Sequence, residues 1–136
     1  MSGVLCLVRA RALPLRSPAL NAYVGVDADR ARVAAGRRHQ QPDQRLCGVP
    51  VSIKSSVSVA GLPFETGSRF RRSITGESDA PLVARLRAAG AIVVGVTNVA
   101  EQLMAWETDN ALYGRTNSPW DLTRTPGGSS GGEAAA

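Results

Sequence analysis

Residues 79–96 read DAPLVARLRAAGAIVVGV, and this stretch decides the predicted fold. Asp79 can cap the free amide groups at the start of a helix, and Pro81 suits the first helical turn. Gly90 is a typical C-terminal stop for that helix. The apolar run of residues 91–96 that follows has the character of a buried strand. Helical spacing places an apolar stripe on the helix, formed by Leu82, Val83 and Leu86.

A second strand is predicted before this helix. Residues 49–53 alternate in polarity, are rich in β-branched side chains, follow Gly48 and end at Lys54. Residues 57–60 are a candidate for pairing beside them. A strand, a helix and another strand in this order imply a right-handed crossover and a parallel or mixed sheet. The predicted fold class is therefore α/β, with a mixed sheet flanked by helices.

Two further helices are predicted outside this unit. Residues 27–38 carry alanines at helical spacing between charged side chains, which predicts an exposed helix, and residues 99–106 predict a short one. Polar and turn-forming residues predict connecting segments at residues 39–48, 61–78 and 110–125. We expect residues 1–26 to form an irregular N-terminal segment and residues 27–136 to be the N-terminal part of a single domain.

The charge and composition of the chain exclude several classes of function. The net charge is +5, from 16 basic and 11 acidic residues, but the arginines are scattered rather than interleaved with aromatic residues, which argues against nucleic-acid binding. No apolar run approaches the roughly 20 residues that a membrane span needs. We interpret the arginine-rich N-terminus as an irregular or misassigned start rather than a targeting segment.

The cysteines and the single histidine predict neither a disulfide framework nor a metal centre. Two cysteines, Cys6 and Cys47, do not make a disulfide framework in a chain that can form its own core. The chain therefore needs no oxidising compartment, and a cytoplasmic location is expected. His39 has no neighbouring ligands at metal-binding spacing.

Lys54 is the only lysine beside 15 arginines, and it stands at the end of a predicted buried strand. Burial can lower the pKa of a lysine by several units from about 10.4, which makes the neutral amine available as a base. Arginine cannot serve in this way. The alternative is a strand-end lysine whose amino group reaches water. Taken alone, the pattern leaves both roles open.

Residues 126–133 read PGGSSGGE, a loop whose glycines let backbone amides approach a ligand or a reacting oxygen closely. A phosphate-binding loop requires lysine and then serine or threonine where Glu133 stands. The segment also matches the G-x-S-x-G elbow, centred on Ser129 or Ser130, but a poor strand precedes it and His39 lies before the serines instead of after them. Glu133 and the alanines after it favour the start of a helix over a flexible linker.

Three blocks together resemble the amidase signature family. They are GVPVSIK at residues 48–54, AAGAIVVGVTN at residues 88–98, and YGRTNSPWDLTRTPGGSSGGEAAA at residues 113–136. Their order and spacing match the family over about residues 46–136. The third block looks most like amidases and fatty acid amide hydrolases, with the tRNA-dependent glutamine amidotransferases, through their A subunit, as less similar relatives.

The resemblance implies a partial amidase-signature fold and a triad of serine, cis-serine and lysine. Lys54 matches the base, Ser129 matches the serine with a cis peptide that bridges base and nucleophile, and Ser130 matches a serine that orients both. Gly127, Gly128 and Gly131 match the supporting loop. The implied reaction cleaves the C–N bond of a small-molecule amide through an acyl-enzyme, without a metal or another cofactor. Candidates for lining the acyl pocket are Leu103, Met104 and Trp106, for which a core helix face is an equal alternative.

Two departures from the family pattern bear on activity. Many members follow the lysine with an acidic residue, whereas Ser55 and Ser56 stand here, which puts the local hydrogen-bond support in doubt. The resemblance also places the nucleophile in a further Gly- and Ser-rich block that residues 1–136 do not contain. We therefore expect a fragment that is truncated at its C-terminus and inactive in isolation. The alternatives are an amidotransferase A subunit that needs partner subunits, or a non-catalytic gene product, and a homo-oligomer stays open.

Overall fold

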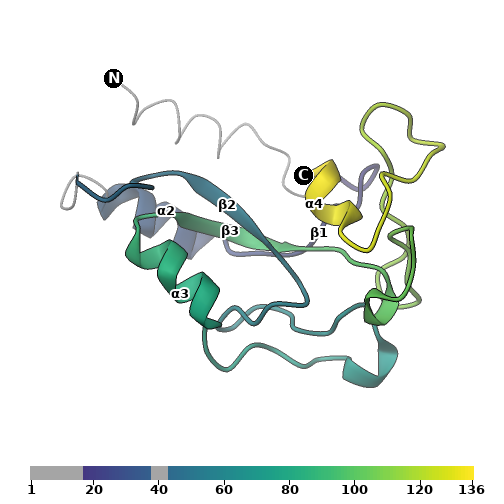
Figure 1. Cartoon of the computed structure of the whole chain (residues 1–136), viewed down its shortest axis with the longest axis horizontal. Coiled ribbons are helices and arrows are strands. Elements are labelled where there is room, and N and C mark those ends of the chain that lie inside the picture. Colours follow the sequence, from purple (N-terminus) through teal and green to yellow (C-terminus); the bar gives the residue numbers. More distant parts are fainter. Residues whose placement is uncertain (1–16, 38–42) are drawn as a thin grey trace.

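The structure is a computed structural model, and it describes residues 17–37 and 43–136 (Figure 1). Its sheet has three strands in the order β1-β3-β2. These are β1 (Tyr23–Val26), β2 (Pro50–Lys54) and β3 (Ile92–Thr97). The central strand β3 pairs in parallel with β2 and antiparallel with β1, so the sheet is mixed. The predicted α/β class with a mixed sheet is confirmed.

Two longer helices cover the two faces of the sheet (Figure 1). Helix α2 (Ala28–Arg37) packs on one face and α3 (Pro81–Ala88) on the other, and both were predicted from sequence periodicity. All six residues of β3 are buried, as expected for a central strand between two helical layers. The α3 face holds a core of Ile53, Val59, Leu62, Val83, Val93 and Val96, and the α2 face a smaller one of Ala35, Ile92 and Val94.

The remaining elements are short. Helix α4 (Gly131–Ala135) packs against β2, and two 3-10 turns, η2 (Arg69–Arg71) and η3 (Glu101–Leu103), interrupt the long loops. The prediction of a helix start at Glu133 is confirmed, with the helix beginning two residues earlier. Residues 61–78 contain only η2 and isolated bridges, in agreement with the predicted loop.

The start of α3 differs from its prediction. Ala80 is the N-cap residue and no side chain caps the helix. The carboxylate of Asp79 is engaged elsewhere, because Oδ1 accepts from the Ala60 amide at 2.9 Å and Oδ2 pairs with Arg87 at 2.8 Å. The apolar stripe is also narrower than predicted: Val83 is 0% exposed, whereas Leu82 is 55% exposed.

Three other predictions of local structure were wrong. Residues 23–26 are not irregular, since they form β1 along the edge of β3. Residues 57–60 form no strand, and Ala60 makes only an isolated bridge to Gly76. Residues 99–106 contain a single 3-10 turn instead of a helix. Their amides bond to other segments instead of forming helical turns, since the Gln102 amide donates to the carbonyl of Thr66 and the Ala100 amide to that of Ser129.

Two predictions for single residues fall outside the described part of the chain, since they concern Cys6 and His39. Within residues 17–37 and 43–136, none of the helices has the length and apolar character that crossing a membrane requires.

Val83 provides a test of the packing between α3 and the sheet. In the full-length protein, Val83→Ala should lower the free energy of unfolding by about 2 kcal/mol, because two buried methyl groups are lost from a closed core. The neighbouring substitution Leu82→Ala should change it by less than about 0.5 kcal/mol, since that side chain is largely exposed. Urea denaturation measures both, and equal losses would contradict the described packing.

Candidate active site

Lys54 lies at the carboxyl end of β2, on the opposite face of the sheet from the larger core. Val51 and Ile53 point into that core, so alternation along the strand directs Ser52 and Lys54 to the other face, where α4 packs. Lys54 is paired in register with Thr97, the last residue of β3. The carboxyl ends of parallel strands are the usual place for sites in open α/β sheets.

The structure brings Lys54 together with both predicted serines. Its Nζ donates to Ser129 Oγ at 2.9 Å and to Ser130 Oγ at 2.7 Å, although these residues are 75 and 76 positions away in sequence. The Gly128–Ser129 peptide bond is cis, as the resemblance implied. Ser129 is partly buried and Ser130 is exposed, so solvent reaches the cluster.

Burial lowers the pKa of the partly buried Lys54 below its ordinary value, and the carboxylate of Glu133 opposes this by raising it. The net shift is downward, which enlarges the neutral fraction of the amine at a given pH. A neutral amine next to two hydroxyl groups can accept a proton from one of them. The cluster therefore has the groups and spacing of a proton relay.

Contacts from the preceding loops hold the serine loop in place. Thr108 Oγ1 donates to the carbonyl of Gly127 at 3.0 Å and accepts from the amide of Gly131 at 2.7 Å, so it ties the loop on both sides of the serines. The carbonyl of Ser129 accepts from the amide of Ala100 at 3.2 Å. The loop is thus attached to the segment that directly follows β3.

The glycines of this motif are needed for close packing against that segment. A Cβ at Gly131 would lie 2.4 Å from Thr108 Oγ1, and one at Gly132 would lie 2.4 Å from both the N and O atoms of Asn98. A Cβ at Gly128 would lie 2.7 Å from the backbone N and C atoms of Glu107, while Gly127 adopts φ +95° with open space around it. The amides of Gly131 and Gly132 are used inside the protein, not left pointing at a ligand.

A buried polar network beneath this loop was not predicted. Asn110 Nδ2 donates to Asn98 Oδ1 at 2.8 Å, and Asn98 Nδ2 donates to Thr116 Oγ1 at 3.0 Å and to the Gly114 carbonyl at 3.0 Å. All three side chains are buried. Sequence patterns place these residues in loops, and only their repeated Asn and Thr side chains hint that they satisfy buried backbone groups.

Glu133 is a second feature that the sequence did not assign to the site. Its carboxylate accepts from Ser52 Oγ at 2.5 Å and from Thr97 Oγ1 at 2.7 Å. The sequence offers one indirect indication of this contact. The two-residue spacing of Ser52 and Lys54 places both side chains on one face of the strand, so a group that binds Ser52 lies on the same face as Lys54.

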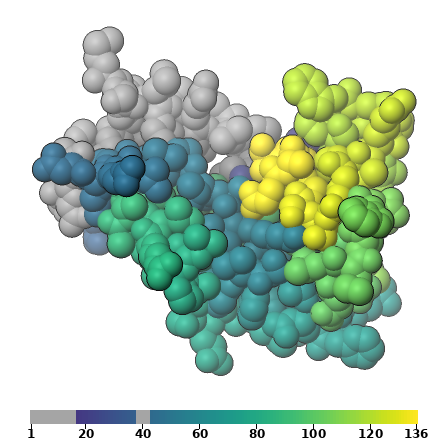
Figure 2. Space-filling model, viewed as in Figure 1, coloured from purple at the N-terminus to yellow at the C-terminus, as the bar shows by residue number. Residues whose placement is uncertain are grey.

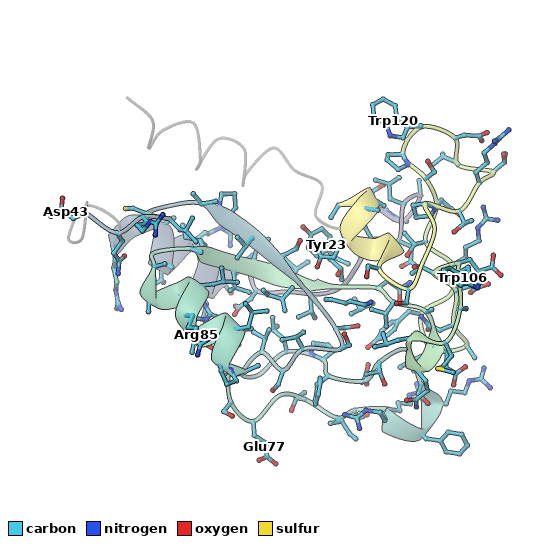
Figure 3. The ribbon with its side chains drawn as sticks, in the orientation of Figure 1. Tyr23, Asp43, Glu77, Arg85, Trp106 and Trp120 are labelled. Atoms are coloured by element: carbon cyan, nitrogen blue, oxygen red, sulfur yellow. The ribbon has the colours of Figure 1, made fainter. Side chains whose placement is uncertain are left out.

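The proposed pocket residues do not belong to a core helix face. Leu103, Met104 and Trp106 are 39%, 86% and 93% exposed, and Trp106 projects from the loops at the edge of the molecule (Figure 3). The helix-face alternative is therefore wrong, and pocket lining stays a prediction. Ser55, which follows the lysine, is buried, and its Oγ has no hydrogen-bond partner among the described residues. The described part of the chain also contains no group of three side chains suited to a metal ion.

The fold and the cluster together define a class: an α/β protein in which a lysine amine and two serine hydroxyls meet at the end of a parallel strand pair. Residues 7–136 match the family model described as Amidase. The chain belongs to the amidase family.

Curated relatives include two kinds of protein. One is the A subunit of glutamyl-tRNA(Gln) amidotransferase from Solidesulfovibrio magneticus, 41% identical over 134 residues that cover 96% of this chain and 27% of that one. The other is the "Putative amidase AmiB2" of Mycobacterium tuberculosis, 46% identical over 121 residues that cover 86% and 26%. The chain thus spans about a quarter of the length of these relatives. The two identities are too similar to bear out the expected ranking of amidases above the amidotransferases.

Solved structures give the same picture. The peptide amidase of Stenotrophomonas maltophilia superimposes with a TM-score of 0.80 at 30% identity, covering 98% of this chain and 29% of that one. The A subunit of the Thermotoga maritima glutamyl-tRNA(Gln) amidotransferase gives a TM-score of 0.74 at 30% identity, covering 98% and 27%. These matches confirm the predicted amidase-signature fold for this part of the domain.

Gly132 tests the close packing of the serine loop. In the full-length protein, Gly132→Ala should cost about 1–3 kcal/mol of stability, because its Cβ would collide with the backbone of Asn98. The matched control is Gly36→Ala in the exposed part of α2, where no atom lies within 4 Å of the new Cβ. That change should stabilise by about 0.5–1 kcal/mol. Thermal unfolding with opposite signs for the two variants supports the described loop, and a neutral Gly132→Ala would refute it.

Proposed function

We propose that the full-length protein hydrolyses carboxylic amides, with Lys54 as the base and Ser129 as the proton relay. The observation that carries the proposal is the contact of one amine with two hydroxyls, 2.9 Å to Ser129 and 2.7 Å to Ser130. The lowered pKa of Lys54 supports the role of a base. Membership of the amidase family supports the choice of an amide as substrate.

The proposed reaction proceeds through an acyl-enzyme. Neutral Lys54 accepts the proton of Ser129 while Ser129 takes one from a nucleophilic serine, whose oxygen attacks the amide carbonyl. The C–N bond then breaks and the relay returns its proton to the leaving amine. Water attacks the resulting ester by the same route, which releases the carboxylic acid and restores the serine.

We assign the nucleophile to a serine of the full-length protein outside residues 1–136. Ser129 and Ser130 both contact the base and fill the relay and orienting roles. By this assignment, residues 1–136 alone have no amide turnover. The relay uses proton transfer between side chains only, so the proposal includes no metal or other cofactor.

We propose Leu103, Met104 and Trp106 as part of the surface that receives the acyl group of a small-molecule amide. They lie a few residues after Ala100, whose amide donates a hydrogen bond to the carbonyl of Ser129. Their apolar side chains are exposed. Exposed apolar patches often mark ligand-binding sites.

A second candidate function is that of an amidotransferase A subunit. It is favoured by identities of 41–44% to the A subunits of glutamyl-tRNA(Gln) amidotransferases. In that role the same relay would act on a glutamine side chain and release ammonia for a partner enzyme. Release of ammonia from glutamine only in the presence of partner subunits would favour this candidate, and turnover of simple amides by the protein alone would favour the first.

Lys54→Arg tests the base directly. Because a guanidinium stays charged, this variant should lower kcat/KM in the full-length protein by about 10²–10⁴-fold, and Ser129→Ala should have a loss of the same order. The measurement is ammonia or amine release from benzamide and p-nitroacetanilide. Arg85→Lys, on the exposed side of α3 (Figure 3), is the control and should retain full activity. Normal turnover by Lys54→Arg would show that Lys54 is not the base.

The pH dependence tests the protonation state of the base. Since only neutral Lys54 accepts a proton, kcat/KM should rise with pH and level off above the pKa of this amine. Burial lowers that pKa, so the midpoint should lie below the ordinary lysine value of 10.5. Initial rates in well-buffered solutions between pH 6 and pH 11 give kcat/KM at each pH, and the midpoint of this profile gives the pKa. A flat profile over the whole range would contradict a lysine base.

A further inference from the structure

Both oxygens of the Glu133 carboxylate are bound by the sheet. Ser52 of β2 donates to Oε2 at 2.5 Å, and Thr97 of β3 donates to Oε1 at 2.7 Å. Thr97 is fully buried and Glu133 is partly buried. Hydroxyl groups that donate to a carboxylate make stronger bonds than neutral pairs do. We call these three residues the Glu133 clamp.

The Glu133 clamp uses the same strand positions that place the base. Ser52 is two residues before Lys54 on one face of β2, and Thr97 is the register partner of Lys54 across the sheet. On the side of the helix, the Glu133 amide donates to the Ser130 carbonyl at 3.1 Å. The clamp therefore joins the backbone of the serine pair to the strand ends that carry Lys54.

Resting on the proposed function, we propose that Glu133 is a positioning residue for the relay. By holding α4 on β2 and β3, it fixes the distances from Lys54 to Ser129 and Ser130. It does not exchange protons with the substrate. Figure 2 shows residues 126–136 at the surface of the molecule, and α4 itself is only five residues long.

The charge of Glu133 provides a second measurable effect, the pKa of Lys54, which a side chain that only packs α4 against the sheet would not change. The carboxylate raises the pKa of Lys54 against the effect of burial, which lowers it. It also contributes to the raised pKa of Tyr23, for which burial is the main cause and a hydrogen bond with Ser52 acts in the opposite direction. Figure 3 shows Tyr23 beside α4. Lys54 and Tyr23 are the titratable groups on which the described structure shows this influence.

The test compares Glu133→Gln and Glu133→Ala with Glu77→Gln in the full-length protein. Glu77 is exposed and points away from the molecule (Figure 3), so its variant controls for the loss of one acidic charge. Lysine labelled with ¹³C at Cε reports the titration of Lys54 by NMR, and the resonance is assigned by its loss in Lys54→Arg. Hydrolysis of p-nitroacetanilide gives kcat and KM for each variant.

We expect Glu133→Gln to lower the pKa of Lys54 and also to lower kcat about 10-fold on the high-pH plateau, where Lys54 is neutral in both proteins, because neutral hydrogen bonds replace charge-assisted ones. Glu133→Ala should lower kcat about 10²-fold with little change in KM, the effect of a misplaced reactive group. Glu77→Gln should change neither quantity. Because the glutamine is isosteric, it decides the question even if the alanine variant does not fold.

Two results would overturn the inference. One is a Glu133→Gln variant with the pKa of Lys54 and kcat of the unmodified protein. The other is a shifted pKa with unchanged kcat, since the carboxylate would then act on charge without positioning the serines. Failure of the proposed function has a different signature: Lys54→Arg would keep normal turnover, whatever the NMR titration reports for Glu133→Gln.

Discussion

The partly buried amine of Lys54 is the constraint on which the site depends. A cationic or neutral amine removed from water needs polar partners, and the neighbouring strands offer mainly apolar side chains. The two serine hydroxyls and, at longer range, the carboxylate of Glu133 supply these partners from a segment 75 to 79 positions later in the sequence. The path of the chain from β3 to α4 therefore has to return to the end of β2.

That return path contains little regular structure, yet side chains fix it. Backbone groups between β3 and α4 find partners in buried asparagines and threonines, chiefly Asn98, Asn110 and Thr108. A backbone that is neither helical nor in a sheet must satisfy its amides and carbonyls in some other way when it is buried. The polar network thus stabilises the loops between β3 and α4 through hydrogen bonds, whereas the valine-rich core stabilises the sheet through apolar packing.

The parts of the structure that rest on local patterns could be predicted from the sequence. Strands β2 and β3 and helices α2 and α3 follow from periodicity and from turn residues such as Gly90, which adopts φ +94°. Strand β1 escaped prediction because it pairs with a strand about 70 positions away and carries no local signal of its own. In the site, Lys54 and the two serines were predicted because their blocks resemble a family, whereas the local pattern alone left open a strand-end lysine whose amino group reaches water. The spacing of Ser52 and Lys54 predicts that they share one face of the strand, but the contact of Glu133 with that face is evident only in the folded chain, because its two partners come from different strands.

Under the proposed function, chemistry and substrate choice depend on different parts of this molecule. As a proton relay, the lysine and serine cluster would act on any amide, so it would suit a hydrolase and an amidotransferase equally well. Met104, Trp106 and Trp120 are among the most exposed large apolar side chains described, and they lie on loops outside the sheet. Loops held on a rigid scaffold are where related proteins change their ligands while keeping their reaction. The difference between a simple amide and a glutamine side chain is therefore to be sought in what these loops contact, not in the relay.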